Sequence, residues 1–105
     1  MIIEEDVRVT GRLNRLSCFA ILRSEDRQYR IDVRTYEARD VAMRHYPART
    51  SVTASSVTDG MLFRKVIREY QTWEEAEEGH LAIMATFRLL GSVKASMDFI
   101  EACEP

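Results

Sequence analysis

The stretch Thr72-Trp73-Glu74-Glu75-Ala76-Glu77-Glu78-Gly79-His80 marks the start of a helix and decides the fold of this chain. Thr72 can cap the helix by accepting a hydrogen bond from the Glu75 amide, and the Glu75 carboxylate can reach back to the Thr72 amide. This reciprocal arrangement is a capping box. The glutamates of the stretch crowd the first turns, where the helix dipole favours negative charge. The sequence therefore predicts a helix beginning near residue 73.

The predicted helix is amphipathic and runs over roughly residues 73–90. Its apolar stripe contains Trp73, Ala76, His80, Ile83, Met84, Phe87 and Leu90. Gly91 supplies a plausible C-terminal stop. We expect Trp73, Ile83 and Phe87 to pack on a sheet, with His80 buried between them.

Segments with strand character precede this helix. Residues 3–10 alternate valines with polar side chains, residues 16–23 are apolar, and residues 28–34 alternate cleanly. The polar turn Asp59-Gly60 separates a β-prone segment, 51–58, from an apolar one, 61–70. These patterns predict an antiparallel sheet.

Two further helices are predicted. Thr35 would cap a short helix over about residues 36–46, which Pro47 would end. Ser92 would cap a terminal helix that extends from Val93 to Cys103. The resulting order, β-β-β-α-β-β-α-α, indicates a single α+β domain over residues 1–105, with the helices packed on one face of a mainly antiparallel sheet.

Composition narrows the class of protein. The chain has 105 residues, of which 46% are hydrophobic and 30% charged, values typical of one globular domain. No apolar run approaches the ~18 residues of a membrane-spanning helix. The N-terminus turns acidic at Glu4 and lacks the basic and apolar regions of a secretory signal, so we expect a cytoplasmic protein without a membrane partner. Cys18 and Cys103 are too few for a disulfide scaffold, which predicts buried thiols.

The sequence favours a non-enzymatic protein. His45 and His80 could act as bases or ligands, but both lie on apolar helix faces, and no Cys-x-x-Cys or His-x-x-x-His spacing indicates a metal site. Glu74, Glu75, Glu77 and Glu78 spread around their helix as a solvated helix start would. No glycine-rich phosphate loop or nucleophile elbow is present, and we expect no cofactor.

Arginine residues on two predicted strands form a candidate partner-binding face. Arg30 and Arg34 share one side of a strand, and Arg64 and Arg68 share one side of another. If the strands are neighbours, the face could meet nucleic acid or an acidic protein. Asp32 interrupts the row, no aromatic side chains are predicted among the arginines, and the net charge is −2. An exposed, solvated sheet face is the alternative.

Surplus apolar side chains on the long helix form a candidate dimer interface. Leu81, Ala85 and Leu89, with Ala82, lie away from the main stripe. The terminal helix could cover them within the chain, or a second copy could do so. Because the terminal helix is short and must bury its own apolar side chains, we expect a homodimer in which the same patch meets itself.

The segment from Arg68 to His80 resembles a recurrent Tyr-x-Thr-Trp-Glu-Glu-Ala-x-x-Gly-His segment of small phage-encoded proteins. The resemblance covers about an eighth of the chain and implies phage or prophage origin, without an activity or a catalytic residue. Because small phage products often bind and inhibit a host protein, we expect a protein-interaction role in the host cell, such as inhibition of a host defence complex, with a host or viral protein as partner. A nucleic-acid-binding module and an accessory structural part of a virion are the alternatives.

Overall fold

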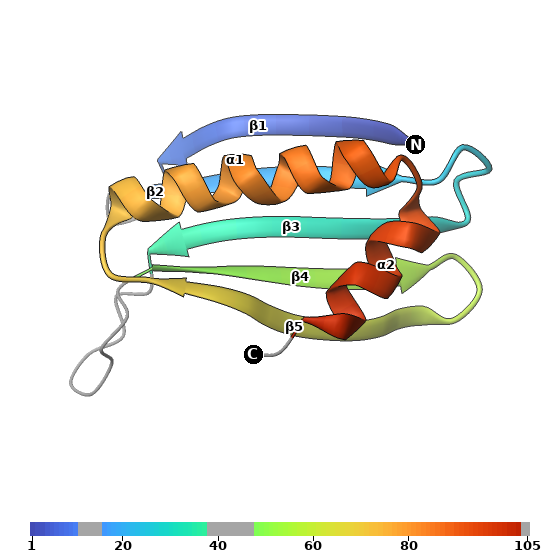
Figure 1. Cartoon of the computed structure of the whole chain (residues 1–105). Coiled ribbons are helices and arrows are strands. Elements are labelled where there is room, and N and C mark those ends of the chain that lie inside the picture. The colour runs from blue at the N-terminus through green and yellow to red at the C-terminus, as the bar shows by residue number, and fades with distance from the viewer. Residues whose placement is uncertain (11–15, 38–47, 104–105) are drawn as a thin grey trace.

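The computed structural model describes residues 1–10, 16–37 and 48–103, and it consists of one sheet and two helices (Figure 1). The strands are β1 (Ile2–Thr10), β2 (Leu16–Arg23), β3 (Tyr29–Glu37), β4 (Ala48–Ser56) and β5 (Gly60–Tyr70). They pair in sequence order, each antiparallel to the next, and α1 (Trp73–Leu90) and α2 (Val93–Ala102) follow. The predicted α+β class is confirmed, and both helices lie on the same face of the sheet (Figure 1).

The predicted element order is wrong at β3. Residues Thr35 to Glu37 were predicted to start a helix, but they continue β3 and pair with β4 through Thr35↔Thr50 and Glu37↔Ala48. Thr35 is therefore a strand residue and not a helix cap. A β-branched residue such as Thr35 packs well at this buried position of a strand. The preference of threonine for helix caps is a local property and does not take this packing into account. The rest of the predicted helix, including His45, lies outside the described residues.

The long helix follows its prediction closely. The Thr72 hydroxyl accepts a hydrogen bond from the Glu75 amide at 3.2 Å, while the Glu75 carboxylate accepts from the Gln71 amide, one residue earlier than a capping box predicts. Gly91 ends α1 in the left-handed conformation, with φ 77°. Since a left-handed residue favours glycine, this C-terminus is encoded in the sequence.

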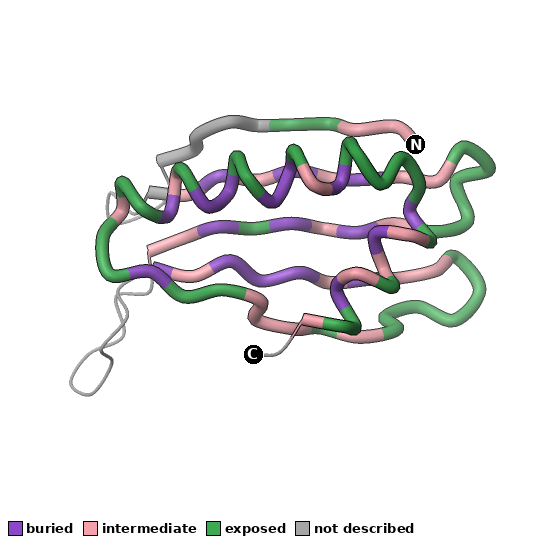
Figure 2. Tube along the Cα trace, in the orientation of Figure 1, coloured by how far each residue is buried: buried purple, intermediate pink, exposed green. Residues whose placement is uncertain are grey.

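The core lies between the sheet and the two helices (Figure 2). On α1, Ile83, Met84 and Phe87 are buried as predicted, whereas Leu90 is exposed. The buried members of the core are Ala20, Leu22, Ile31, Val33, Val52, Ala54, Ile83, Met84, Phe87, Val93 and Ile100. Trp73 joins a second, smaller cluster with Ala48, Tyr70 and Ala76.

The C-terminal helix contacts both α1 and the sheet. Its Phe99 packs edge-on against Phe87 of α1, with ring centroids 6.1 Å apart. The Lys65 ammonium of β5 donates to the carbonyls of Ile100, Glu101 and Cys103 at the end of the helix. A cation at this end complements the helix dipole, so Lys65 fixes α2 over β5.

Candidate functional site

A chain of buried hydrogen bonds crosses the sheet beneath α1. The Tyr70 hydroxyl bonds the Thr50 hydroxyl at 2.8 Å, Thr50 bonds Thr35 at 2.6 Å, and Thr35 bonds Nδ1 of His80 at 2.8 Å. All these residues are buried. Burial lowers the pKa of His80, and the nearby Glu5 charge opposes that effect in part. His80 is thus a hydrogen-bonded core histidine, as predicted.

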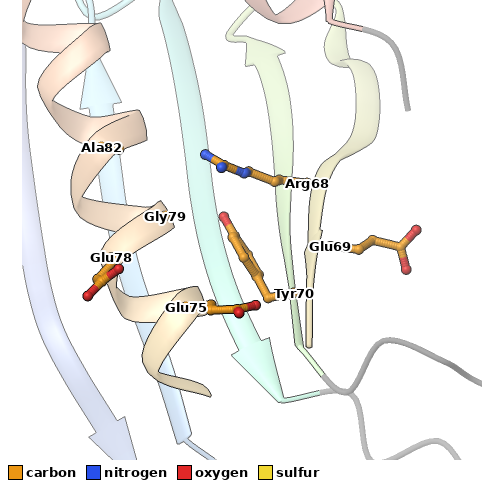
Figure 3. Close-up of a pocket in the computed structure, with 7 residues that line it drawn as sticks. All are labelled: Arg68, Glu69, Tyr70, Glu75, Glu78, Gly79 and Ala82. Atoms are coloured by element: carbon orange, nitrogen blue, oxygen red, sulfur yellow. The ribbon is translucent and has the colours of Figure 1, made fainter. Parts of the chain in front are cut away.

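Tyr70 also lines a pocket between β5 and the first half of α1 (Figure 3). The pocket has a volume of about 370 Å³. It is lined by Arg68, Glu69, Tyr70, Glu75, Glu78, Gly79 and Ala82. In the close-up, Arg68 and the Tyr70 hydroxyl extend toward the helix, whereas Glu69 points away from it (Figure 3). The predicted partner-binding residue Arg68 therefore belongs to this pocket.

The bulge in β5 explains why Arg68 leaves the predicted arginine face. Thr50 pairs with Arg68, but the next residue of β4, Ser51, pairs with Val66, so Ile67 is an extra residue in β5. An extra residue reverses the alternation of side chains beyond it. Arg68 consequently shares the helix-covered face with Thr50, and the prediction that it accompanies Arg30, Arg34 and Arg64 is wrong.

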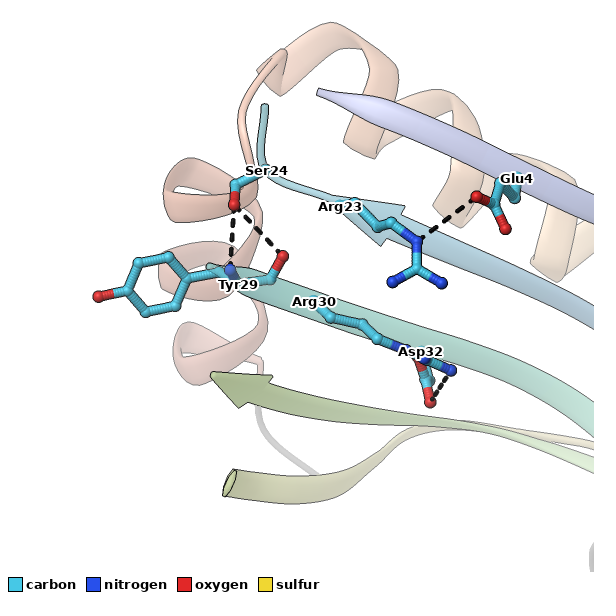
Figure 4. A network of polar contacts seen from close by, with 6 residues as sticks. All are labelled: Glu4, Arg23, Ser24, Tyr29, Arg30 and Asp32. Atoms are coloured by element: carbon cyan, nitrogen blue, oxygen red, sulfur yellow. Dashed lines mark hydrogen bonds and ion pairs between the residues drawn. The ribbon is translucent and has the colours of Figure 1, made fainter. Parts of the chain in front are cut away.

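The remaining three predicted arginines lie on the face of the sheet opposite α1 and α2, which we call the open face. Figure 4 shows Arg30 on this face. Cross-strand partners share a face, and here the rows run Arg23↔Arg30↔Ser55, Ile21↔Asp32↔Thr53↔Arg64 and Phe19↔Arg34↔Ser51↔Val66, with Tyr36↔Arg49↔Glu69 beyond them. Burial alternates accordingly along β3, where Ile31, Val33 and Thr35 face the helices. The structure therefore places Arg30, Arg34 and Arg64 on one face, although β3 and β5 are not neighbours and β4 lies between them.

Two arginines of the open face are paired with carboxylates. Arg30 makes a two-pronged contact with Asp32, at 2.5 Å from Nε and 3.2 Å from Nη2, and this hydrogen bonding raises the pKa of Arg30. Arg23 lies 3.4 Å from the Glu4 carboxylate (Figure 4). Asp32 thus interrupts the row of arginines on β3, as the sequence predicted.

The other three arginines of the open face, Arg34, Arg49 and Arg64, take part in no ion pair within the described residues. The Arg34 guanidinium lies 4.9 Å from the centroid of the Tyr36 ring, a cation–π contact. Nε of Arg49 is buried and has no hydrogen-bond partner in this part of the structure. Arg64 is exposed. These charges remain available to a partner.

Aromatic and aliphatic side chains lie among the arginines, contrary to prediction. Phe19 stands opposite Arg34, and Tyr36 lies two residues further along β3 on the same face. Both rings are half-buried, as are Ile21 and Val66. Phe19 lies in the predicted strand 16–23, but this run is apolar on both sides and does not show which face is open. Tyr36 and Arg49 were missed because the segment around them was assigned to a helix and a loop.

The outer side of α1 carries the predicted dimer residues, and α2 does not cover them. Leu81 is 61% and Leu89 89% exposed, and Ala85 between them is exposed as well. They follow one another at intervals of four residues, so they form a ridge on the solvent side of the helix. The alternative that the terminal helix covers this ridge is wrong.

No group of three potential metal ligands (His, Cys, Asp or Glu) gathers within residues 1–10, 16–37 and 48–103. Over the same residues, no helix is both long enough and apolar enough to cross a membrane. Comparison of the chain with protein-family models, with curated proteins and with solved structures finds no match.

Proposed function

We propose that this chain is a non-enzymatic binding protein that attaches the open face of its sheet to an acidic surface of another protein. The observation that carries the proposal is the cluster of Arg34, Arg49 and Arg64, which form no ion pair within the described residues and lie around half-buried apolar side chains on the sheet face opposite α1 and α2. Arginine and aromatic residues are enriched at the centres of protein interfaces, where they dominate the binding energy.

The mixture of charges on the open face favours a protein over nucleic acid. Glu4, Asp32 and Glu69 lie on the same face as the arginines. A duplex presents a regular array of phosphates, which these carboxylates would repel. A protein surface can place a basic group opposite each carboxylate and an acidic group opposite each free arginine.

The resemblance of the Arg68–His80 segment to phage-encoded proteins suggests a form for this proposal. The partner would be a host protein in the cytoplasm of an infected cell, and attachment would inhibit it, as an antagonist of a defence complex does. An accessory role in a virion, with a viral protein as the partner, is the alternative form. Both forms use the same face.

Co-purification from a bacterial lysate tests the proposal. We expect tagged wild-type protein to retain a host protein that Arg34→Glu loses. The new carboxylate would repel the acidic surface of the partner, and it would leave the acidic group opposite Arg34 without a pair. Lys94→Glu, which changes an exposed cation on α2, is the matched control and should retain it. Equal retention by all three proteins, or retention by none, would contradict the proposal.

Single-stranded nucleic acid is the second candidate, and one observation favours it. Arg34 and Tyr36 form a stacked pair with Phe19 beside them, and arginine planes and aromatic rings are the surfaces on which unpaired bases stack. Fluorescence anisotropy with oligo-dT would detect such binding. Its affinity should then fall with salt with a log–log slope of about −0.7 per phosphate contacted, and Tyr36→Leu should weaken it.

A homodimer through the α1 ridge is a separate proposal. Leu81, Ala85 and Leu89 support it because a single side of one helix presents them together to solvent. The ridge lies on the helical layer and the open face on the opposite side of the sheet. A dimer formed through the ridge would therefore leave both open faces accessible.

A further inference from the structure

Three departures from regular local structure meet at the pocket between β5 and α1. The extra residue Ile67 turns Arg68 into the pocket. Gly79, a poor helix former, occupies the middle of α1. A polar chain runs from Tyr70 through the core to His80. Departures from local structural preference are expected to concentrate at functional sites.

The positive charge of the pocket belongs to Arg68. Arg68 contacts the face of Tyr70, with 5.7 Å from its guanidinium carbon to the ring centroid, and it is in no ion pair within the described residues. The two carboxylates that α1 contributes to the pocket, Glu75 and Glu78, do not neutralise Arg68. Glu75 accepts the Gln71 amide at the start of the helix, and Glu78 points away from Arg68 (Figure 3).

The direction of the hydrogen bonds decides what the pocket can bind. If Nδ1 of His80 accepts, then Thr35, Thr50 and Tyr70 each donate toward it, and the Tyr70 hydroxyl has no proton left for the pocket. If Nδ1 carries a proton, it donates to Thr35 and the chain reverses. Thr50 then donates to Tyr70, whose own O–H is released to donate into the pocket.

We infer that the pocket binds an oxyanion, a carboxylate or a tetrahedral phosphate-like group, between the Arg68 guanidinium and the Tyr70 hydroxyl, and that the threonine chain couples this binding to a proton on His80. Guanidinium and phenol are both donors, and a charged acceptor makes their hydrogen bonds strong. An anion requires the Tyr70 O–H, so it favours the reversed chain and a proton on Nδ1, which the neutral Nδ1–H tautomer and the imidazolium both provide. Of these two forms, the negative charge of the anion favours the imidazolium. Binding and protonation therefore strengthen each other, as linkage requires.

The surroundings of His80 act on its protonation in opposite directions. Glu5 of β1 favours the imidazolium, and burial disfavours it. Cys18 of β2 stands opposite Thr35, Tyr70 of β5 ends the chain, and Glu77 lies one turn earlier on α1. Glu77 accepts the Trp73 indole N–H, which orients it along its own helix. A bound anion would add its negative charge to that of Glu5, and both charges stabilise the protonated His80 ring.

Histidine NMR of the full chain tests the inference. The chain has two histidines, and His45→Gln identifies the His80 ring signals. Sulfate and acetate are titrated separately at constant ionic strength, because their charges stay fixed near neutral pH and their shapes differ. We expect the His80 signals to shift saturably with at least one anion and the pKa of His80 to rise when it is bound. The Kd should fall toward acid pH, roughly threefold for each half unit of that rise.

Two variants separate coupling from non-specific effects. Arg68→Gln should abolish the saturable shift, whereas Arg27→Gln, in the exposed β2–β3 turn, should leave it unchanged. Tyr70→Phe keeps the ring against Gly79 but removes the hydroxyl, so the anion should bind more weakly and leave the pKa of His80 unmoved. No saturable shift with either anion in folded protein, an equal shift in Arg68→Gln, or tighter binding at alkaline pH would overturn the inference.

Discussion

Gly79 lies directly against the ring of Tyr70, so closely that a β-carbon at residue 79 would be 2.3 Å from Cε1 of the tyrosine. Real β-carbons essentially never approach another atom so closely. The glycine in the middle of α1 is therefore required by the tyrosine that ends β5. This contact joins the strand to the helix and places the Tyr70 hydroxyl against Thr50.

Gly79→Ala should destabilise the protein although alanine is the better helix former. The gain in helix propensity is about 1 kcal/mol, whereas forcing the Tyr70 ring to move in a packed core costs typically 1–3 kcal/mol and here separates Tyr70 from Thr50 as well. Urea unfolding measures the difference. The control Ala85→Gly, at a position of the same helix that is exposed in the monomer, should lose about 1 kcal/mol from propensity when unfolding is measured at a concentration where the protein is monomeric. A Gly79→Ala protein more stable than wild type would refute the contact.

Phe87→Ala should lower the free energy of unfolding by about 3–5 kcal/mol, because Phe87 is fully buried between the sheet and Phe99. Leu89→Ala, two residues away on the solvent side, should change it by no more than about 0.5 kcal/mol in the monomer. Chemical denaturation of both variants checks the assignment of the helix faces. A cost under about 1 kcal/mol for Phe87→Ala would reverse that assignment.

The buried His80 should make the protein less stable in mild acid. Its pKa is lowered in the folded state, so as pH falls below the ordinary histidine value of about 6.5 the unfolded chain binds a proton that the folded chain resists. Stability should fall as pH decreases from about 6.5 to the pKa of His80 in the folded state. Above about pH 6.5, His80 should not change the stability. His80→Gln should flatten this part of the stability profile relative to wild type. His45→Gln serves as the control for the other histidine, and an identical slope in wild type and His80→Gln would contradict the burial of a neutral ring.

The α1 ridge should hold two copies together. Sedimentation at high micromolar concentration should report about twice the 12.2 kDa of the chain, and Leu89→Glu should return it to a monomer, because a charge buried without a partner in an apolar interface is costly. A monomer in the wild type would rule out the ridge as an interface. A dimer that survives Leu89→Glu would move the interface elsewhere.

The elements near the Thr72–His80 stretch could be predicted because their signals are local. Thr72, Gly91 and the apolar spacing of α1 each depend on residues within a few positions, and the bounds of α1 match the prediction. The failure at Thr35 has the opposite cause. Its preference for a helix cap is local, but its pairing with Thr50 and its bond to His80 come from distant parts of the chain and prevail.

The candidate site was predicted in part for the same reason. Strict alternation placed Arg30, Arg34 and Arg64 correctly, because β3 is regular and β5 is regular around Arg64. The bulge at Ile67 leaves no clear mark in the sequence, so the face of Arg68 could not be read from spacing. The pocket and the Tyr70–His80 chain depend on side chains from three strands and a helix, which only the assembled sheet brings together.

Arg64 and Arg68 provide the most direct test of the open face, because they lie four residues apart on one strand and face opposite sides of the sheet. The measurement is the affinity, by calorimetry, of the protein partner captured from the lysate for Arg64→Glu and for Arg68→Glu, each checked for an unchanged melting temperature. Arg64→Glu should weaken binding about 30-fold or more, equivalent to about 2 kcal/mol, while Arg68→Glu should leave the affinity within about threefold of wild type. Loss of binding in Arg68→Glu with Arg64→Glu unaffected, or no loss in either, would contradict attachment through the open face.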